Sequence, residues 1–297
     1  MKLPVRSDLV RIEPVRFTAN QELRVDCLRL DLLDPLISGN KWFKLLPWLQ
    51  LAREKKAAAI ASFGGLWSNH LLAMAAAARH FGIKAFGIIR GEDLPVASTA
   101  DLRRLGMELI FASRSDYQLF QQEPARCPAL PDNTFIIPEG GQGLPGVHGA
   151  AALLDPLPSP GDYTHIALAV GTGTSLAGIL SAVNPRQKLI GISILKGEDS
   201  LSAQINEWVP GKAAQFELSF RFHFGGYARY TPALLAFMNQ LYREQQIPLD
   251  FVYTAKLFYG IREMIMENYF PPESRLLLVH SGGLPGNRSL PVDSLGY

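Results

Sequence analysis

From residue 57 onward, two kinds of segment alternate along the chain, and this alternation limits the possible fold more than any other feature. Short apolar runs of strand length are separated by longer amphipathic runs, most of which begin at Ser or Thr or end at Gly. We expect strands at 57–63, 84–89, 108–111, 134–137, 164–170, 188–194, 251–253 and 276–279. We expect helices at 42–56, 70–81, 98–105, 115–122, 175–183, 200–209, 231–245 and 257–268. This order predicts an α/β protein whose parallel sheets carry helices on both faces.

A Pro- and Gly-rich stretch at 124–146, followed by 156–161, is the best candidate for a hinge between two α/β units. We therefore predict a small domain at 50–150, inserted into a large domain made of 1–49 and 151–297. Open parallel sheets bind ligands at the carboxyl ends of their strands. Functional residues are expected where the strands end.

Charge and composition narrow the class of partner. The 297 residues include 29 basic and 27 acidic ones, a formal charge of +2, which gives no reason to expect nucleic acid or an anionic membrane. Cys27 and Cys127 are far apart and match no zinc spacing, so neither a disulfide framework nor a metal site is predicted. Residues 1–19 lack the apolar core of a signal peptide, and no window approaches the roughly 18 apolar residues of a membrane span. We expect a cytoplasmic protein with a small-molecule partner, and a homodimer is the default for an enzyme of this size.

The tetrapeptide at 38–41, Ser-Gly-Asn-Lys, precedes the apolar start of a predicted helix. Lys41 would therefore have its stem among hydrophobic neighbours and its amine at a helix start. Desolvation and the positive end of the helix dipole both lower the pKa of such an amine, as a Schiff-base lysine requires. The alternative interpretation is a solvated lysine at a helix start.

Two strand ends carry glycine-rich polar turns. Gly64 to His70 follows the strand at 57–63, and either Ser68 or Asn69 is a competent helix N-cap. Capping alone does not explain why three polar side chains and two glycines gather there, which favours a ligand-binding turn. Gly171-Thr172-Gly173-Thr174-Ser175 precedes another helix and makes an anion cup of backbone N–H groups and hydroxyls. Because it lacks a P-loop and a complete dinucleotide fingerprint, a single phosphate fits it best.

Two further strand ends are Tyr253-Thr254 and His280-Ser281-Gly282-Gly283. A lone tyrosine or histidine at such a place most often serves packing. Taken together, however, the chain offers a Schiff-base lysine, a monophosphate cup and two polar glycine turns, with no metal-binding set. This combination is what pyridoxal 5'-phosphate needs, since its aldehyde takes a lysine and its phosphate takes a cup.

Six motifs in order resemble those of the fold type II, or tryptophan synthase β-like, pyridoxal-phosphate enzymes. They are SGNK at 38–41, GGLWSNH at 64–70, GTGTSLAG at 171–178, GGYARY at 225–230, YT at 253–254 and HSGG at 280–283. Within that group the series is most similar to the branch of D-cysteine desulfhydrase and 1-aminocyclopropane-1-carboxylate deaminase. The resemblance runs from about residue 35 to 284. It implies two open three-layer domains with the active site in the cleft between them.

The resemblance also implies roles for the residues that bind the cofactor. Lys41 would form the Schiff base and later move the substrate α-proton. Asn69 would hydrogen-bond the phenolic oxygen of the cofactor, and Ser281 would lie near its pyridine nitrogen. The phosphate would be bound by Gly171, Thr172, Gly173, Thr174 and Ser175.

On the substrate side, the resemblance places Ser68 and His70, together with Asn69, at the substrate carboxylate or the reacting carbon. Tyr253 would stack near the substrate and donate a proton. Lys41, Ser68 and Tyr253 are thus the predicted catalytic residues.

The reaction implied is β-elimination from a small amino acid, giving a 2-oxo acid and ammonia, with D-cysteine as the first substrate to consider. Deaminases of this branch have a further tyrosine about ten residues past the histidine of HxGG, and 284–290 contains none. This disfavours opening of a cyclopropane ring. Trp67 and Leu72 also depart from the residues usual in relatives, which leaves the substrate open.

Three alternatives remain at this stage. Within the same chemistry the chain could be a 1-aminocyclopropane-1-carboxylate deaminase, or act on another small amino acid. From another class, it could be a non-catalytic protein that uses the cup for a phosphate-bearing ligand. A nucleotide-binding α/β protein is disfavoured because the P-loop and dinucleotide fingerprints are missing.

Overall fold

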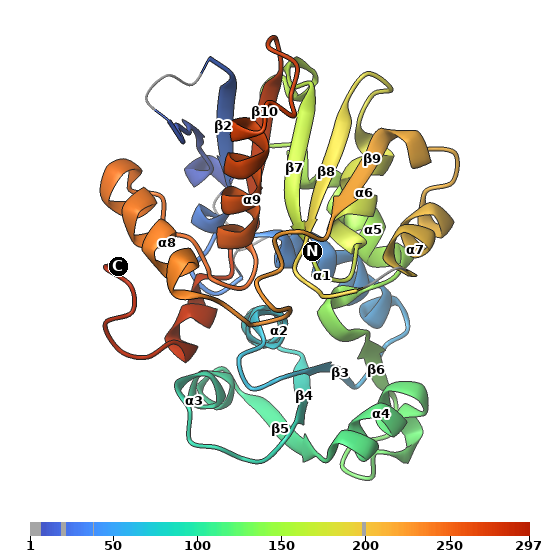
Figure 1. Ribbon diagram of the computed structural model, residues 1–297. Helices are drawn as coiled ribbons and strands as arrows, with labels where there is room; N and C mark the ends of the chain where they lie inside the picture. The colour runs from blue at the N-terminus through green and yellow to red at the C-terminus, as the bar shows by residue number, and fades with distance from the viewer. Residues whose placement is uncertain (1–6, 19–21, 38, 198–199) are drawn as a thin grey trace.

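The protein is described by a computed structural model that covers residues 7–18, 22–37, 39–197 and 200–297. It contains a six-stranded sheet in the order β1-β2-β10-β7-β8-β9 and a four-stranded sheet in the order β5-β4-β3-β6 (Figure 1). Every described pairing is parallel except that of β1 with β2. The strands are β1 (Ile12–Pro14), β2 (Arg24–Arg29), β3 (Ala59–Gly64), β4 (Lys84–Arg90), β5 (Met107–Ala112), β6 (Thr134–Ile137), β7 (His165–Val170), β8 (Lys188–Ser193), β9 (Phe216–Ser219) and β10 (Arg275–His280).

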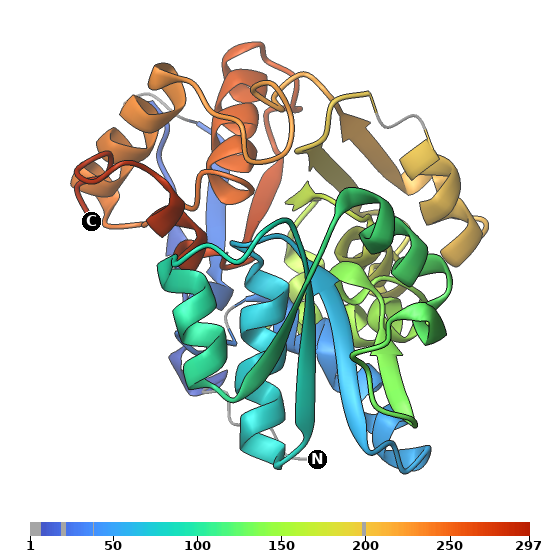
Figure 2. The ribbon, with the colours of Figure 1, turned by 90° about the horizontal axis from the view of Figure 1, so that it is seen from below.

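Helices cover both faces of each sheet. Helices α8 and α9 pack on one face of the six-stranded sheet, and α5, α6 and α7 pack on the other. Figure 2 shows the four-stranded sheet from below, with α2 and α3 on one face and α4 on the other. The helices are α1 (Asn40–Glu54), α2 (Asn69–Phe81), α3 (Ala97–Arg104), α4 (Arg114–Gln122), α5 (Leu144–Ala150), α6 (Thr174–Ala182), α7 (Ser200–Trp208), α8 (Pro232–Gln245) and α9 (Thr254–Met266).

The predicted α/β class with two open parallel-sheet units is confirmed. All four strands of the smaller sheet come from 59–137, within the predicted small domain. The predicted domain boundaries stay predictions, and α1 runs through the one at 49/50 because its apolar side joins the core of the smaller unit.

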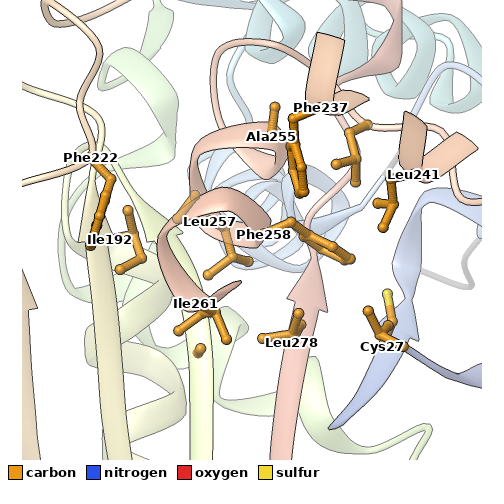
Figure 3. Packing of buried hydrophobic residues seen from close by; sticks show 14 of the residues in the cluster. Cys27, Ile192, Phe222, Phe237, Leu241, Ala255, Leu257, Phe258, Ile261 and Leu278 are labelled. Atoms are coloured by element: carbon orange, nitrogen blue, oxygen red, sulfur yellow. The ribbon is translucent and has the colours of Figure 1, made fainter. Parts of the chain in front are cut away.

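The largest described core lies between the six-stranded sheet and helices α8 and α9. Figure 3 shows Phe258 and Ile261 of α9 facing Leu278 of β10 and Cys27 of β2. All four side chains are fully buried. Burial of a large apolar side chain stabilises the folded protein by about 1.5–3 kcal/mol. This packing fixes the start of α9 against the carboxyl end of the sheet.

The strand expected at 251–253 is wrong. Those residues form a turn before α9, because the buried carboxylate of Asp250 accepts hydrogen bonds from the backbone N–H groups of Val252, Tyr253 and Thr254 at 2.9–3.0 Å. Backbone donors held by a side chain are not available to a neighbouring strand.

Part of the Pro- and Gly-rich segment at 124–146 is also helical, which the sequence analysis did not predict. Helix α5 packs closely against α1 and α6. A Cβ on Gly149 would lie 1.9 Å from the carbonyl oxygen of Phe43, so only glycine allows these backbones to meet. Gly149, just past that segment, therefore serves close helix packing, and the predicted hinge stays a prediction.

Among the described helices, none combines the length and the apolar character needed to cross a lipid bilayer.

Candidate active site

The polar strand ends meet at one cavity of about 340 Å³. Its walls come from the carboxyl ends of β3, β4, β6, β7 and β8, together with the start of α1 and the turn before α9. A larger open hollow of about 880 Å³ lies beside β1 and β2, away from these strand ends. The smaller cavity is lined by Asn40, Lys41, Lys44, Ser68, Asn69, His70, Arg90, Glu139, Gly140, Ala169, Val170, Gly171, Thr172, Gly173, Thr174, Ser175, Leu176, Ile194, Tyr227 and Tyr253.

Lys41 lies in the first turn of α1, as predicted, and its position depends on Gly39. Gly39 has φ +63°, and a Cβ there would lie 1.8 Å from the carbonyl oxygen of Ser281. That same carbonyl accepts a hydrogen bond from the backbone N–H of Asn40 at 3.2 Å. The loop after β10 thus sets where α1 begins, and α1 directs Lys41 into the cavity.

The amine of Lys41 is largely withdrawn from water. Its Nζ donates to Oδ1 of Asn40 at 2.8 Å and lies 5.5 Å from the centre of the Tyr253 ring. Burial lowers the pKa of Lys41 to about 8, and the charge of Asp250 acts weakly in the opposite direction. The amine is therefore more available as a nucleophile than that of an exposed lysine.

The glycine turn after β7 has the features of an anion cup. Gly173 takes a left-handed conformation (φ +77°) and is the N-cap of α6, whose free N–H groups face the cavity end. The hydroxyls of Thr172 and Thr174 lie 3.0 Å apart. Nδ2 of Asn40 donates to Oγ of Ser175 at 2.8 Å, which joins the cup to the residue before Lys41.

The turn after β3 combines helix capping with polar groups that face the cavity. Ser68 is the N-cap of α2, since its Oγ accepts from the backbone N–H of Leu71 at 3.2 Å. Nδ2 of Asn69 donates to the carbonyl oxygen of Gly283 at 3.2 Å and so links this turn to the loop after β10. Ser68 therefore both caps α2 and lines the cavity.

His70 is 4% exposed and has one unpartnered ring nitrogen. Its Nε2 shares a hydrogen bond of 2.8 Å with Oγ of Ser62, while Nδ1 has no partner in the part of the chain that the structure describes. Burial lowers the pKa of His70 well below its usual range, and Lys44 and Lys41 lower it further. The ring lines the cavity and is held neutral, so it would present no positive charge to a ligand there.

Lys44 is a site residue that the sequence analysis missed. It lines the cavity at 5% exposure, and its Nζ makes no hydrogen bond or ion pair with any described residue. Burial, followed by the charge of Lys41, lowers the pKa of Lys44 well below its usual range. The sequence could have indicated it, because residues three apart in a helix, such as Lys41 and Lys44, lie on the same face. A buried amine without a counter-charge implies an anionic ligand.

Tyr227, from the GGYARY motif, was also missed as a site residue. Its ring meets that of Tyr253 edge-on, with centres 6.3 Å apart. Burial, with contributions from Tyr227 and Asp250, raises the pKa of Tyr253 well above its usual range. The Tyr253 hydroxyl therefore stays protonated and can donate.

Arg90 and Glu139 complete the described wall on the side of the smaller sheet. Oε2 of Glu139 accepts from the Tyr117 hydroxyl at 3.0 Å and from Nε2 of Gln121 at 2.9 Å. The Arg90 guanidinium lies 5.9 Å from the centre of the Tyr117 ring. A single charged residue at the end of a strand has no recognisable sequence pattern, so Arg90 and Glu139 were not predicted as site residues.

Of the predicted site residues, Lys41, Ser68, Asn69, His70, the five from Gly171 to Ser175, and Tyr253 are brought to the cavity. Ser281 is 8% exposed and lies behind Gly39 and Asn40, outside the cavity wall. Its predicted contact with the pyridine nitrogen stays a prediction. Ser38 of the SGNK motif lies outside the described residues.

These groups fit a small molecule with an anionic end and a carbonyl. The unpartnered Lys44 amine and the N–H groups of α6 suit a phosphate, and the free amine of Lys41 suits an aldehyde.

Comparison with known proteins agrees with this chemistry. Residues 16–282 match the family described as pyridoxal-phosphate dependent enzyme. A provisionally assigned 1-aminocyclopropane-1-carboxylate deaminase of Thermotoga maritima is 28% identical over 285 residues, covering 87% of this chain and 88% of that protein. A protein of the same provisional assignment from Pyrococcus horikoshii is 24% identical, covering 92% and 90%.

Solved structures show the same fold at lower identity. An ACC deaminase homologue has a TM-score of 0.79 at 23% identity and covers 94% of this chain and 90% of its own. A hydrogen sulfide-producing enzyme from Fusobacterium nucleatum has a TM-score of 0.67 at 11% identity, covering 96% and 98%.

Proposed function

Since the chain belongs to the pyridoxal-phosphate-dependent enzymes, we propose that it is a lyase that releases ammonia and a 2-oxo acid from a small amino acid, with D-cysteine as the first substrate. The observation that carries the proposal is Lys41, a largely buried amine with a pKa of about 8. It shares one cavity with an anion cup, and a protonated tyrosine lies 5.5 Å from the amine. Its cofactor is pyridoxal 5'-phosphate, so a non-catalytic phosphate binder is no longer favoured.

The cup and Lys44 would hold the cofactor phosphate. The turn Gly171 to Ser175 supplies backbone N–H groups at the start of α6, and the Lys44 amine supplies further N–H donors, whose protonated form a phosphate dianion would favour. Asn69 would bind the phenolic oxygen, and its bond to Gly283 keeps its amide in place.

Bound pyridoxal phosphate supplies an electron sink for the negative charge that develops at the substrate Cα. The free amine of Lys41 accepts the α-proton, for which a pKa near the working pH is well suited. The start of α2 with Ser68 and the neutral His70 would bind the substrate carboxylate. The Tyr253 hydroxyl donates a proton to the leaving sulfur. Overall, D-cysteine and water give pyruvate, hydrogen sulfide and ammonia.

Deamination of 1-aminocyclopropane-1-carboxylate is the second candidate, because the relatives named above carry that provisional assignment. Ring opening needs a proton donor or nucleophile placed at the ring carbon. The segment 284–290 has no tyrosine, and Leu284–Ser289 forms a 3-10 helix whose Gly286 lies beside the Asn69 amide. Tyr253 and Tyr227 are the tyrosines among the described residues that line the cavity. This favours elimination over ring opening.

Release of 2-oxo acid from D-cysteine, D-serine and 1-aminocyclopropane-1-carboxylate distinguishes the two candidates. We expect pyruvate from D-cysteine or D-serine, and none from the Lys41→Ala variant. Release of 2-oxobutyrate from the cyclopropane alone would favour the deaminase. No product from any of the three would refute the proposed substrate class.

The expectation of a cytoplasmic homodimer stays a prediction. The mass of the protein in solution, measured by light scattering after gel filtration, tests whether it is a dimer. A monomer would contradict that prediction.

A further inference from the structure

Lys256, in the first turn of α9, is fully buried and has no part in the mechanism above. Its Nζ donates to two backbone carbonyl oxygens, that of His223 at 2.9 Å and that of Gly226 at 2.7 Å. A charged amine is costly to bury unless it is paired or hydrogen-bonded. Both oxygens belong to the irregular loop between β9 and α8, so the role of this amine lies in that loop.

The loop has an unusual backbone conformation. Phe224 and Ala228 have φ of +51° and +53°, in the left-handed region that residues with a Cβ rarely adopt. Gly225 and Gly226, between them, also have positive φ. Such backbone persists only where surrounding contacts determine it.

The same loop carries Tyr227 to the cavity. Tyr227 follows Gly226 directly, and its ring meets Tyr253 edge-on at 6.3 Å. Tyr253 in turn lies 5.5 Å from the Lys41 amine. Lys256 is three residues past Tyr253. The first turn of α9 therefore holds Tyr253 directly, and it holds Tyr227 through the loop that Lys256 binds.

We propose that Lys256 is a positioning residue, whose ammonium holds the 223–230 loop in the conformation that places Tyr227 against Tyr253. The aromatic contact of Phe224 with Tyr259 of α9, at 4.9 Å between ring centres, holds the loop on one side. Each of the two carbonyl oxygens also accepts one backbone N–H from within the loop, that of Gly226 at 3.0 Å and that of Arg229 at 3.1 Å, so Lys256 is the donor that ties both turns to α9. The proposal rests on the proposed function for its catalytic consequence, but its structural consequence stands apart from it.

Hydrogen exchange tests the structural part on the protein as purified. Lys256→Met keeps the apolar stem and removes the donors, so amides of 223–230 should exchange about tenfold faster or more. Lys212→Met is the matched control, because Lys212 also donates to backbone carbonyls, those of Leu180, Ser181 and Val183, at the far end of α6. The control should leave exchange in 223–230 unchanged. Unchanged exchange there in Lys256→Met would overturn the proposal.

A double-mutant cycle tests whether Lys256 acts through Tyr227. We expect Lys256→Met to lower kcat/KM for the amino-acid substrate about tenfold in the wild-type background and not at all in Tyr227→Ala. Equal losses in both backgrounds would show that Lys256 does not act through Tyr227. If no amino acid is turned over, the proposed function fails, while the exchange experiment still decides the role of Lys256.

Should Lys256→Met fail to fold, Gly226→Ala disturbs the same contact from the loop side. Gly226 has φ +113°, so alanine there strains the backbone that carries one accepting carbonyl and leaves α9 intact. We expect the same faster exchange in 223–230 and the same loss of kcat/KM. Wild-type exchange with wild-type kcat/KM in this variant would overturn the proposal.

Discussion

Raising the pH through the pKa of Lys41 should turn its amine into a reactive nucleophile at the cavity. Burial lowers that pKa from 10.5 to about 8. At pH 7.5 about 24% of Lys41 would be the free amine, against about 0.1% for a lysine at 10.5, a ratio of about 240. The shift corresponds to about 3 kcal/mol, chiefly the cost of desolvating the ammonium.

Trace labelling of the cofactor-free protein with acetic anhydride, across pH 6.5–11, measures this directly. The rate at Lys41, read from its peptide by mass spectrometry, should rise with an inflection near 8. The same protein unfolded in urea is the control, because there Lys41 should titrate near 10.5. Peptide mapping separates Lys41 from Lys44 and Lys256.

The shift also has a consequence for stability. Between about pH 8 and 10.5 the unfolded chain holds a proton on Lys41 that the folded chain has lost. The free energy of unfolding should therefore rise with pH in this window, and Lys41→Met should remove part of that rise. An inflection near 10.5 in the folded protein, or identical titrations folded and unfolded, would refute the reasoning.

Three further perturbations test other contacts. Lys44→Met should weaken pyridoxal phosphate binding about 10- to 100-fold by equilibrium dialysis, because the phosphate loses a charged donor; unchanged affinity would place the phosphate elsewhere. Gly39→Ala should lower the free energy of unfolding in urea by about 3 kcal/mol or more, because its Cβ would overlap the Ser281 carbonyl. The control is Gly82→Ala, which has φ +64° but open space around it and should lower the free energy of unfolding by about 1 kcal/mol. Similar losses for both would show that the close approach is not limiting. Arg29→Met should cost about 3–5 kcal/mol at pH 7, because it leaves the buried Asp31 carboxylate without its bidentate partner.

The Arg29 variant also has a defined pH dependence. Burial by itself raises the pKa of Asp31, but His280 and the hydrogen bonds and charge of Arg29 outweigh it, and the net pKa lies below 3.8. The stability that this pair contributes is therefore present above pH 3.8 and lost as pH falls through the folded pKa. Urea unfolding at pH 7 and at acid pH should show a smaller difference between variant and wild type in acid, and an equal difference would contradict this account.

Local sequence alone determined the order of the elements and most of the site. The alternation of strand-length and helix-length runs predicts parallel sheets, and parallel sheets bring strand ends together, so Gly171 and Ser68 could be placed beside Lys41 without coordinates. The glycines and hydroxyls of these turns have local signatures. Lys44 was within reach of the same reasoning, because helical spacing puts it on the face of Lys41.

Tertiary structure decided the rest, since contacts between distant segments leave no local pattern. Residues 251–253 have strand-like composition, but the Asp250 carboxylate binds their backbone N–H groups and makes them a helix start. Tyr227 reaches the cavity from a loop whose carbonyl groups bind Lys256 of α9, about 30 residues further on. Whether a glycine is required for close packing, as at Gly149, depends on the backbone that approaches it. Burial of a charged group is likewise a property of the packed chain, so the sequence could suggest a lowered pKa for Lys41 but only the fold provides the desolvation that causes it.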